Sequence, residues 1–178
     1  MVWNLVDLKS HKTERGEDYF AINPKGYVPA LRLGDGSLLT ENIAILQYLA
    51  DKHPQSELAP PPASQERYRL QEWLAYITGE IHKAFAPIFG GADEQGLAKA
   101  REKIVKRLHY ADKHLEKNSY LMGARFSVAD AYFFVMLTWC PKAKIDLSSF
   151  ARLPAYRDRI AARPAVQAAM KAEGLHTA

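Results

Sequence analysis

Glu41 and Asn42 could together hold the charged end of an amino acid or short peptide. They stand directly before Ile43, Leu46 and Leu49, whose spacing predicts one face of a helix. The start of a helix carries unpaired N–H groups and a partial positive charge, which suit a small carboxylate. The Glu41 carboxylate could bind an amine beside it. These residues alone also permit a simpler interpretation, in which Glu41 only complements the helix dipole.

Val28 and Pro29 precede a predicted hairpin that leads the chain to Glu41. Proline cannot donate a hydrogen bond to a sheet, so Pro29 belongs at the first position of a strand or at a turn before one. That placement leaves the backbone groups of Val28 unclaimed by a neighbouring strand. Asp35 and Gly36 are typical of a tight turn and predict antiparallel strands at residues 30–33 and 37–39. The alternative is that Pro29 merely turns the chain.

Composition and charge indicate a globular protein. Hydrophobic residues make up 48% of the 178 residues, which is enough for a packed core. No apolar run reaches the roughly 18 residues of a membrane helix, and no secretion signal follows Met1, so we expect a cytoplasmic protein without a membrane partner. The 24 Lys and Arg outnumber the 20 Asp and Glu, which gives a net charge of +4. The basic side chains, however, alternate with acidic and apolar ones along the sequence. That pattern argues against a nucleic-acid partner.

The single cysteine, Cys140, excludes an internal disulfide and a Cys-x-x-Cys redox centre. It lies at the end of a long apolar stretch. A cysteine in such a stretch is expected to be buried and unreactive, because burial disfavours the thiolate. We therefore do not expect Cys140 to act as a nucleophile.

A proline-rich stretch divides the sequence into two expected domains. Pro60, Pro61 and Pro62 cannot continue a helix, which predicts a linker over residues 54–63. The N-terminal domain, residues 1–54, is expected to contain a strand at residues 2–8, a short helix within residues 16–23, the hairpin and the helix after it. The second domain, residues 64–178, is expected to be all-helical.

The second domain contains five predicted helices. Ser64 is a plausible N-cap for a helix over residues 67–85 that ends near Pro87, and an amphipathic helix follows over residues 97–115. Ser127 and Asp130 have the spacing of a capping box. The helix that they begin is apolar all round and should form the buried centre of a bundle. Two shorter helices, within residues 153–162 and 163–174, complete the set.

These segments, taken in order, resemble the glutathione transferases, and the bacterial beta class in particular. The resemblance is carried by NPKGYVPAL, LLTENIAILQYLAD, EIHKAFAPIF, RFSVADAY and RPAVQAAMKAEGL. It extends over essentially the whole chain from Val2. The resemblance implies an α+β fold, in which a truncated thioredoxin-like N-terminal domain is followed by an all-helical glutathione transferase C-terminal bundle.

The resemblance also assigns the binding of glutathione, as co-substrate, to residues of the N-terminal domain. In the family, the residue before a cis proline pairs its backbone with the cysteinyl part of glutathione, and this role falls on Val28 with Pro29. The γ-glutamyl end would be bound by Glu41 and Asn42. The resemblance implies no metal ion.

The resemblance places two residues of the helical domain in the wall of the family's catalytic cleft. His82 and Lys83 match a His-Lys pair that lines the cleft above the sulfur in the family. A histidine there could hydrogen-bond the thiol, and a nearby cation would favour the reactive thiolate. Considered without the resemblance, His82 would be interpreted as a surface or boundary residue.

The sequence departs from the family's pattern at its beginning. The family starts with a strand and a helix that supply a catalytic Cys, Ser or Tyr, and that strand lies between those expected here at residues 2–8 and 30–33. This sequence starts at the second strand, so we expect a divided sheet without that catalytic residue. Ala75 and Gly79 replace an Asn and a small hydroxyl residue, and His11 replaces a basic one.

Two functions are therefore compared, with a third possibility that the sequence is a fragment. The first is a transferase that conjugates glutathione thiolate to small hydrophobic electrophiles in detoxification. This transferase is expected to be a cytoplasmic homodimer. The second is a catalytically impaired module with the same fold that binds a ligand or a partner.

Overall fold

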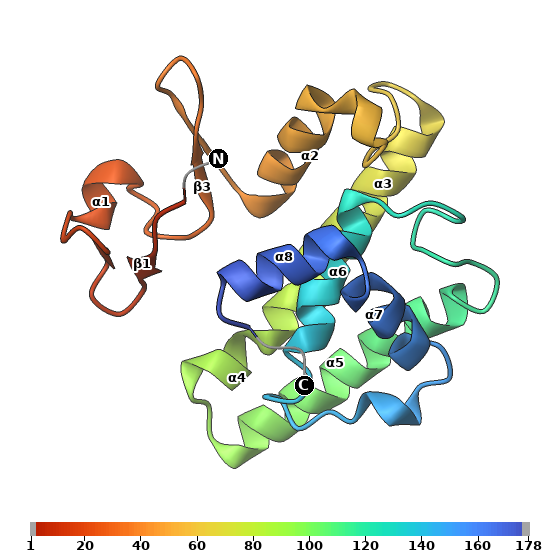
Figure 1. Ribbon diagram of the computed structural model, residues 1–178. Coiled ribbons are helices and arrows are strands. Elements are labelled where there is room, and N and C mark those ends of the chain that lie inside the picture. Colours follow the sequence, from red (N-terminus) through yellow and green to blue (C-terminus); the bar gives the residue numbers. More distant parts are fainter. Residues whose placement is uncertain (1–2, 176–178) are drawn as a thin grey trace. The chain divides into compact units, whose positions relative to one another are not determined.

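The computed structural model describes residues 3–175, and the chain divides after His53 into two compact units. The first unit contains short strands and two helices, whereas the second is helical (Figure 1). Residues 54–63 belong to the second unit, in which η1 (Pro54–Ser56) is one 3₁₀ turn. Among the described residues, no helix has the length and apolar character needed to cross a bilayer.

The hairpin of the first unit forms where the sequence predicts it. Strand β3 (Ala30–Arg32) pairs antiparallel with β4 (Leu38–Thr40), and Leu31 lies opposite Leu39. In the turn, the Asp35 carboxylate accepts hydrogen bonds from the Ser37 N–H and hydroxyl at 2.9 and 2.6 Å. Gly36 has a φ of 85°, a conformation that glycine adopts without steric cost. Helix α2 (Asn42–Lys52) begins one residue after Glu41, as expected.

The strand predicted over residues 2–8 is wrong in its extent. Only β1 (Val6–Asp7) is a strand, and it pairs with β2 (Lys12–Thr13), which precedes the short helix α1 (Tyr19–Ile22). Val2 lies outside the described residues. The strand ends at Asp7 because its carboxylate accepts from the Lys9 N–H at 2.9 Å and turns the chain. Within residues 3–175, no ladder joins β1 and β2 to β3 and β4.

A nearly continuous helical path opens the second unit. The Ser64 hydroxyl accepts from the Arg67 N–H at 3.1 Å and caps α3 (Gln65–Tyr76). The path continues through a π-helical turn, η2 (Ile77–Ile81), a 3₁₀ turn, η3 (His82–Phe85), and α4 (Ala86–Gly90). The sequence predicted an end near Pro87, but this proline lies in the first turn of α4. Its missing N–H costs no helical hydrogen bond there, so the path continues to Gly90.

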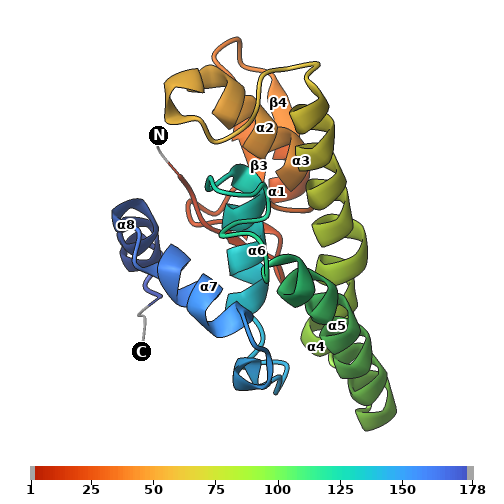
Figure 2. The same ribbon diagram turned by 90° about the vertical axis from the view of Figure 1, so that its right-hand side faces the viewer.

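Helix α6 (Val128–Thr138) is the centre of the helical unit. It lies between α3 and α7 (Leu153–Ala161) (Figures 1 and 2), and eight of its eleven residues are buried. The burial is not complete, because Val135 is 41% exposed. The remaining elements are α5 (Glu94–His114), η4 (Leu147–Ser149) and α8 (Pro164–Ala172).

The Asp130 carboxylate joins three segments of this unit. The predicted capping box is present, and the Ser127 N–H and hydroxyl donate to Asp130 at 2.8 and 2.7 Å. The Leu121 N–H and the Tyr156 hydroxyl donate to the other carboxylate oxygen at 2.7 and 2.8 Å. Burial raises the pKa of Asp130, and these four donated hydrogen bonds oppose that effect. The Asp130 side chain therefore joins the loop before α6 and helix α7 to the first turn of α6.

We expect Asp130→Asn to lower the free energy of unfolding by about 2 to 4 kcal/mol, because an amide leaves buried donors without an acceptor. Urea titration followed by circular dichroism would measure the loss. Asp146→Asn is the matched control, since Asp146 caps the 3₁₀ turn η4 at the surface. Equal losses in the two variants would contradict the role assigned to Asp130.

Candidate functional site

The first unit presents Val28 with free main-chain groups. The Val28–Pro29 peptide bond is cis, as the resemblance implied. Neither the N–H nor the carbonyl of Val28 makes a hydrogen bond within the part of the chain that the structure describes, and the residue is 46% exposed. An extended peptide could therefore pair with both groups, as with one residue of a strand edge.

The chain before Val28 is held by two side chains of the α1 region. The Tyr19 hydroxyl and the Asn23 side-chain amide donate to the Tyr27 carbonyl at 2.9 and 2.7 Å. Tyr19 and Asn23 are both buried. Since these bonds occupy the carbonyl next to Val28, they fix the direction in which the Val28 groups point. Sequence analysis did not identify either residue, because an ordinary Tyr and Asn in a short helix carry no local signal.

Glu41 lies at the N-cap of α2 but does not cap it. Its carbonyl accepts from the Ala44 and Ile45 N–H groups at 3.0 Å each, while its carboxylate makes no cap hydrogen bond. The N–H groups of Asn42 and Ile43 are left without a partner among residues 3–175. These two donors lie at the positive end of the helix and suit a carboxylate.

The Glu41 carboxylate instead faces Lys25. Lys25 Nζ lies 2.7 Å from Glu41 Oε1 and 3.0 Å from the Thr40 hydroxyl. Both side chains are more than half exposed, so this ion pair adds little stability. Sequence analysis did not identify Lys25 as a partner of Glu41, since it stands sixteen positions before it. Its basic character within NPKGYVPAL is the one available signal.

Glu41 has an unusual backbone conformation. Its φ is 70° and its ψ is 118°, a combination that residues with a side chain rarely adopt. Strained backbone of this kind persists where the surrounding structure imposes it, and it is concentrated at functional sites. Here it directs the Glu41 side chain away from its own helix and toward Lys25.

In the second unit, His82 is held by Tyr132. The His82 Nδ1 atom lies 2.6 Å from the Tyr132 hydroxyl oxygen, and the Thr78 hydroxyl lies 3.5 Å from the same oxygen. The π-helical turn η2 directly precedes His82, and such turns are frequent at functional sites. Tyr132 was not identified from the sequence, because fifty positions separate it from His82.

Aromatic rings surround His82 on one side. The ring of Trp139 lies 5.0 Å from that of His82, and Phe85 and Phe89 lie 5.5 and 4.8 Å from Trp139, centroid to centroid. Half-burial among these rings lowers the pKa of His82, because desolvation disfavours the imidazolium. Lys83 is exposed, and its ammonium has no partner among the described residues.

Cys140 is unsuited to nucleophilic chemistry, in agreement with the sequence. It is fully buried, and its Sγ lies 3.6 Å from the Met136 carbonyl oxygen. Burial raises the pKa of the thiol to about 12, so the thiolate is scarce at neutral pH. No three His, Cys, Asp or Glu side chains within residues 3–175 gather into a metal-binding group.

Two family models match the chain and together cover most of it. The model described as the glutathione S-transferase N-terminal domain matches residues 2–52, and the model of the C-terminal domain matches residues 67–164. The chain belongs to the glutathione S-transferase family. The thioredoxin-like first unit and the helical second unit follow from that membership.

Individual members of the family are similar over nearly the whole chain. Glutathione S-transferase GstA of Escherichia coli O157:H7 is 46% identical over 171 residues, which are 96% of this chain and 85% of that protein. A glutathione S-transferase structure from a sphingomonad, in complex with glutathione, is 47% identical with a TM-score of 0.93, over 97% of this chain and 87% of that one. These similarities favour the transferase function over the impaired binding module.

The similarity extends to the bacterial beta class. A beta-class glutathione S-transferase structure from Sphingomonas chungbukensis is 46% identical and has a TM-score of 0.94. The match covers 97% of this chain and 87% of that one. The resemblance drawn from the sequence motifs is confirmed at the level of the class.

The lowered pKa of His82 predicts a pH dependence of stability. The unfolded chain takes up a proton on this residue at a higher pH than the folded chain does, so stability decreases as the pH falls. We expect the free energy of unfolding to fall between about pH 7 and pH 5, and His82→Gln to remove part of that fall.

Urea titrations at several pH values would measure this effect. His109→Gln is the control, because His109 is an exposed histidine of the same unit whose ring contacts that of Phe150. Parallel pH profiles of the wild-type chain and His82→Gln would show that His82 does not contribute.

Proposed function

We propose that the protein conjugates glutathione to small hydrophobic electrophiles, and that the first unit binds the tripeptide. The observation that carries the proposal is the pair of free Val28 main-chain groups, held in place by Tyr19 and Asn23. They would pair with the cysteinyl residue of glutathione, and Pro29 follows Val28 after a cis peptide bond.

The γ-glutamyl end of glutathione carries an amine and a carboxylate, and the start of α2 offers a partner for each. The Glu41 carboxylate would bind the amine. The free N–H groups of Asn42 and Ile43 would bind the carboxylate. Lys25 keeps Glu41 in the required orientation through their 2.7 Å contact. The relative that was solved with glutathione supports this choice of ligand.

The second unit would supply the groups that act on the sulfur. The Tyr132 hydroxyl oxygen accepts a hydrogen bond from the Thr78 hydroxyl. The hydrogen of the Tyr132 hydroxyl is therefore directed to His82 Nδ1. The proton of the neutral imidazole then resides on Nε2, which can donate a hydrogen bond to the glutathione thiolate. The Lys83 ammonium would add a positive charge that lowers the pKa of the thiol.

The reaction itself is a displacement or addition at carbon. The thiol loses its proton to solvent, the thiolate attacks the electrophilic carbon, and the new C–S bond forms as a leaving group departs or a double bond opens. The aromatic rings of Phe85, Phe89 and Trp139 beside His82 favour an apolar electrophile. We further propose a cytoplasmic homodimer with a role in detoxification, as the family resemblance implies.

Glutathione binding tests the first part of the proposal. We expect Glu41→Ala to weaken binding about tenfold or more, because a charge-assisted hydrogen bond is lost. Isothermal titration calorimetry would measure both dissociation constants. Glu14→Ala is the matched control, an acidic residue of the same unit whose side chain has no partner among the described residues. A wild-type chain that binds no glutathione at millimolar concentration would contradict the proposal.

Conjugation kinetics test the second part. We expect His82→Gln to lower kcat/KM for glutathione and chlorodinitrobenzene about tenfold, with little change in glutathione affinity, because only the thiolate loses a donor. Lys83→Met should shift the pH profile of kcat/KM to higher pH. His109→Gln again serves as the control. Wild-type conjugation at the uncatalysed rate would overturn the transferase proposal and favour the impaired binding module.

A further inference from the structure

A polar pocket opens in the helical unit between the end of α5 and the start of α7. Its volume is about 420 Å³, which is within the range of small-molecule sites, roughly 300 to 1,000 Å³. Residues 115–119, which follow α5, form one wall, and Arg152, Ala155 and Arg159 form the other. None of the residues described above around His82 lines this pocket.

The wall formed by α7 carries two arginines with a small residue between them. Arg152, Ala155 and Arg159 are spaced by three and four positions, so they share one face of the helix. The Asp112 carboxylate accepts from the N–H groups of Arg152 and Leu153 at 2.8 and 2.9 Å, which holds the start of α7 against α5. Ala155 has only a methyl group and leaves space between the two arginines.

The Arg159 side chain is ordered by contacts with the opposite wall. Its Nη2 donates to the Ser119 carbonyl at 3.0 Å, and its guanidinium carbon lies 5.5 Å from the centre of the Tyr120 ring. A guanidinium group has five N–H donors, and this hydrogen bond uses one of them. The other donors belong to a group that is already held in place, which reduces the entropy lost when a ligand binds.

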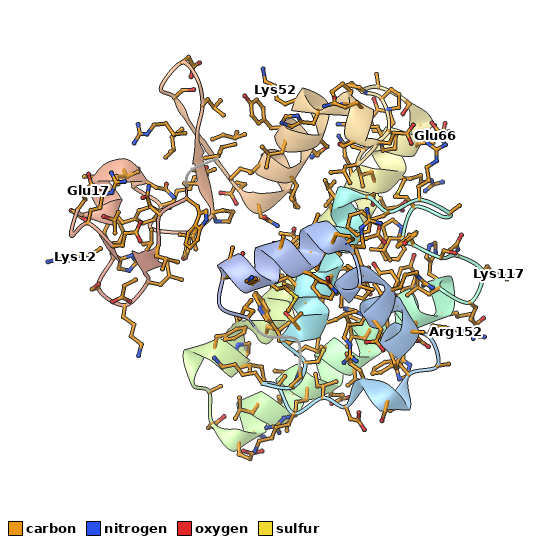
Figure 3. All side chains as sticks on the ribbon, viewed as in Figure 1. Lys12, Glu17, Lys52, Glu66, Lys117 and Arg152 are labelled. Atoms are coloured by element: carbon orange, nitrogen blue, oxygen red, sulfur yellow. The ribbon has the colours of Figure 1, made fainter. Side chains whose placement is uncertain are left out.

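Lys117 and Arg152 add two positive charges that no ion pair compensates. The two side chains lie on the same side of the helical unit (Figure 3), one on the loop after α5 and the other at the start of α7. Neither forms an ion pair or a side-chain hydrogen bond within residues 3–175. Glu116 supplies the only carboxylate among the residues that line the pocket, so three cations face one anion. The pocket therefore favours an anionic ligand.

The loop after α5 also offers main-chain donors. The N–H groups of Asn118 and Ser119 make no hydrogen bond within the part of the chain that the structure describes, and both residues line the pocket. Consecutive free N–H groups of this kind bind the oxygens of anions. The Ser119 hydroxyl is exposed at the same place and can donate as well.

We propose that this pocket binds a small phosphate monoester, with the phosphate group held by Lys117, Arg152 and Arg159. A phosphate monoester carries a charge near −2 at neutral pH and three oxygens that accept strong hydrogen bonds. Arginine binds such oxygens through parallel N–H groups. A carboxylate, with one charge and two oxygens, would leave more of these donors unused. The volume of the pocket also accommodates an organic group beside Ala155.

The probe for the test is phenyl phosphate, and phenyl sulfate is its tetrahedral analogue with one negative charge fewer. NMR titration of the backbone amide signals at pH 8 measures both affinities. We expect saturable shifts of the Asn118 and Ser119 signals. Phenyl phosphate should bind at least about threefold more tightly than phenyl sulfate, because its second charge interacts with the same cations. Inorganic phosphate should bind more weakly than phenyl phosphate, since it has no organic group.

Variants separate the contributions of charge and shape. Lys117→Gln and Arg152→Gln should each weaken the binding of phenyl phosphate about threefold or more, because one charge partner is lost. Ala155→Leu keeps every charge but fills the space between the arginines, and it should weaken binding about tenfold. Lys99→Gln is the matched control, since it removes an exposed cation of α5 that does not line the pocket. It should leave the affinity unchanged.

Four results would overturn the proposal. Equal affinities for phenyl phosphate and phenyl sulfate would show that the second charge is not recognised. Equal affinities for phenyl phosphate and inorganic phosphate would show that the organic group is not recognised. An effect of Arg152→Gln no larger than that of Lys99→Gln would indicate general attraction to a basic surface. Unchanged binding in Ala155→Leu would place the phosphate group outside this pocket.

Discussion

The second unit depends on one buried carboxylate. Asp130 receives hydrogen bonds from Leu121, Ser127 and Tyr156, so the loop, α6 and α7 meet at a single group. Tyr132 stands two residues further along α6 and holds His82. The orientation of His82 is therefore linked to a capping interaction that does not touch it.

The first unit has no comparable centre. Its buried apolar side chains are Tyr19, Ile45 and Ala50 among the described residues, and each of its sheets has two strands. Isolated two-stranded sheets are marginally stable, so local hydrogen bonds carry much of its order. The bonds to the Tyr27 carbonyl are of this kind. Binding of a ligand to such a unit would also stabilise it, because the ligand binds only the folded form.

Local patterns in the sequence predicted the features that depend on near neighbours. The Asp35–Gly36 turn, the caps at Ser64 and Ser127 and the start of α2 each depend on residues within a few positions. Pairings over long separations were not predictable: Lys25 with Glu41, and Tyr132 with His82. The extent of β1 was misjudged for the same reason, since a strand needs a partner that its own sequence does not specify.

The π-helical turn η2, directly before His82, determines the face of the helical path on which the His82 side chain lies. A π turn contains one residue more than an α-helical path of the same length would need, and each residue of an α-helix rotates its successor by about 100°. The face on which His82 emerges is therefore set by the number of residues before it as well as by their identity. A chain shortened by one residue in η2 could keep every side chain named here and still turn the imidazole away from Tyr132.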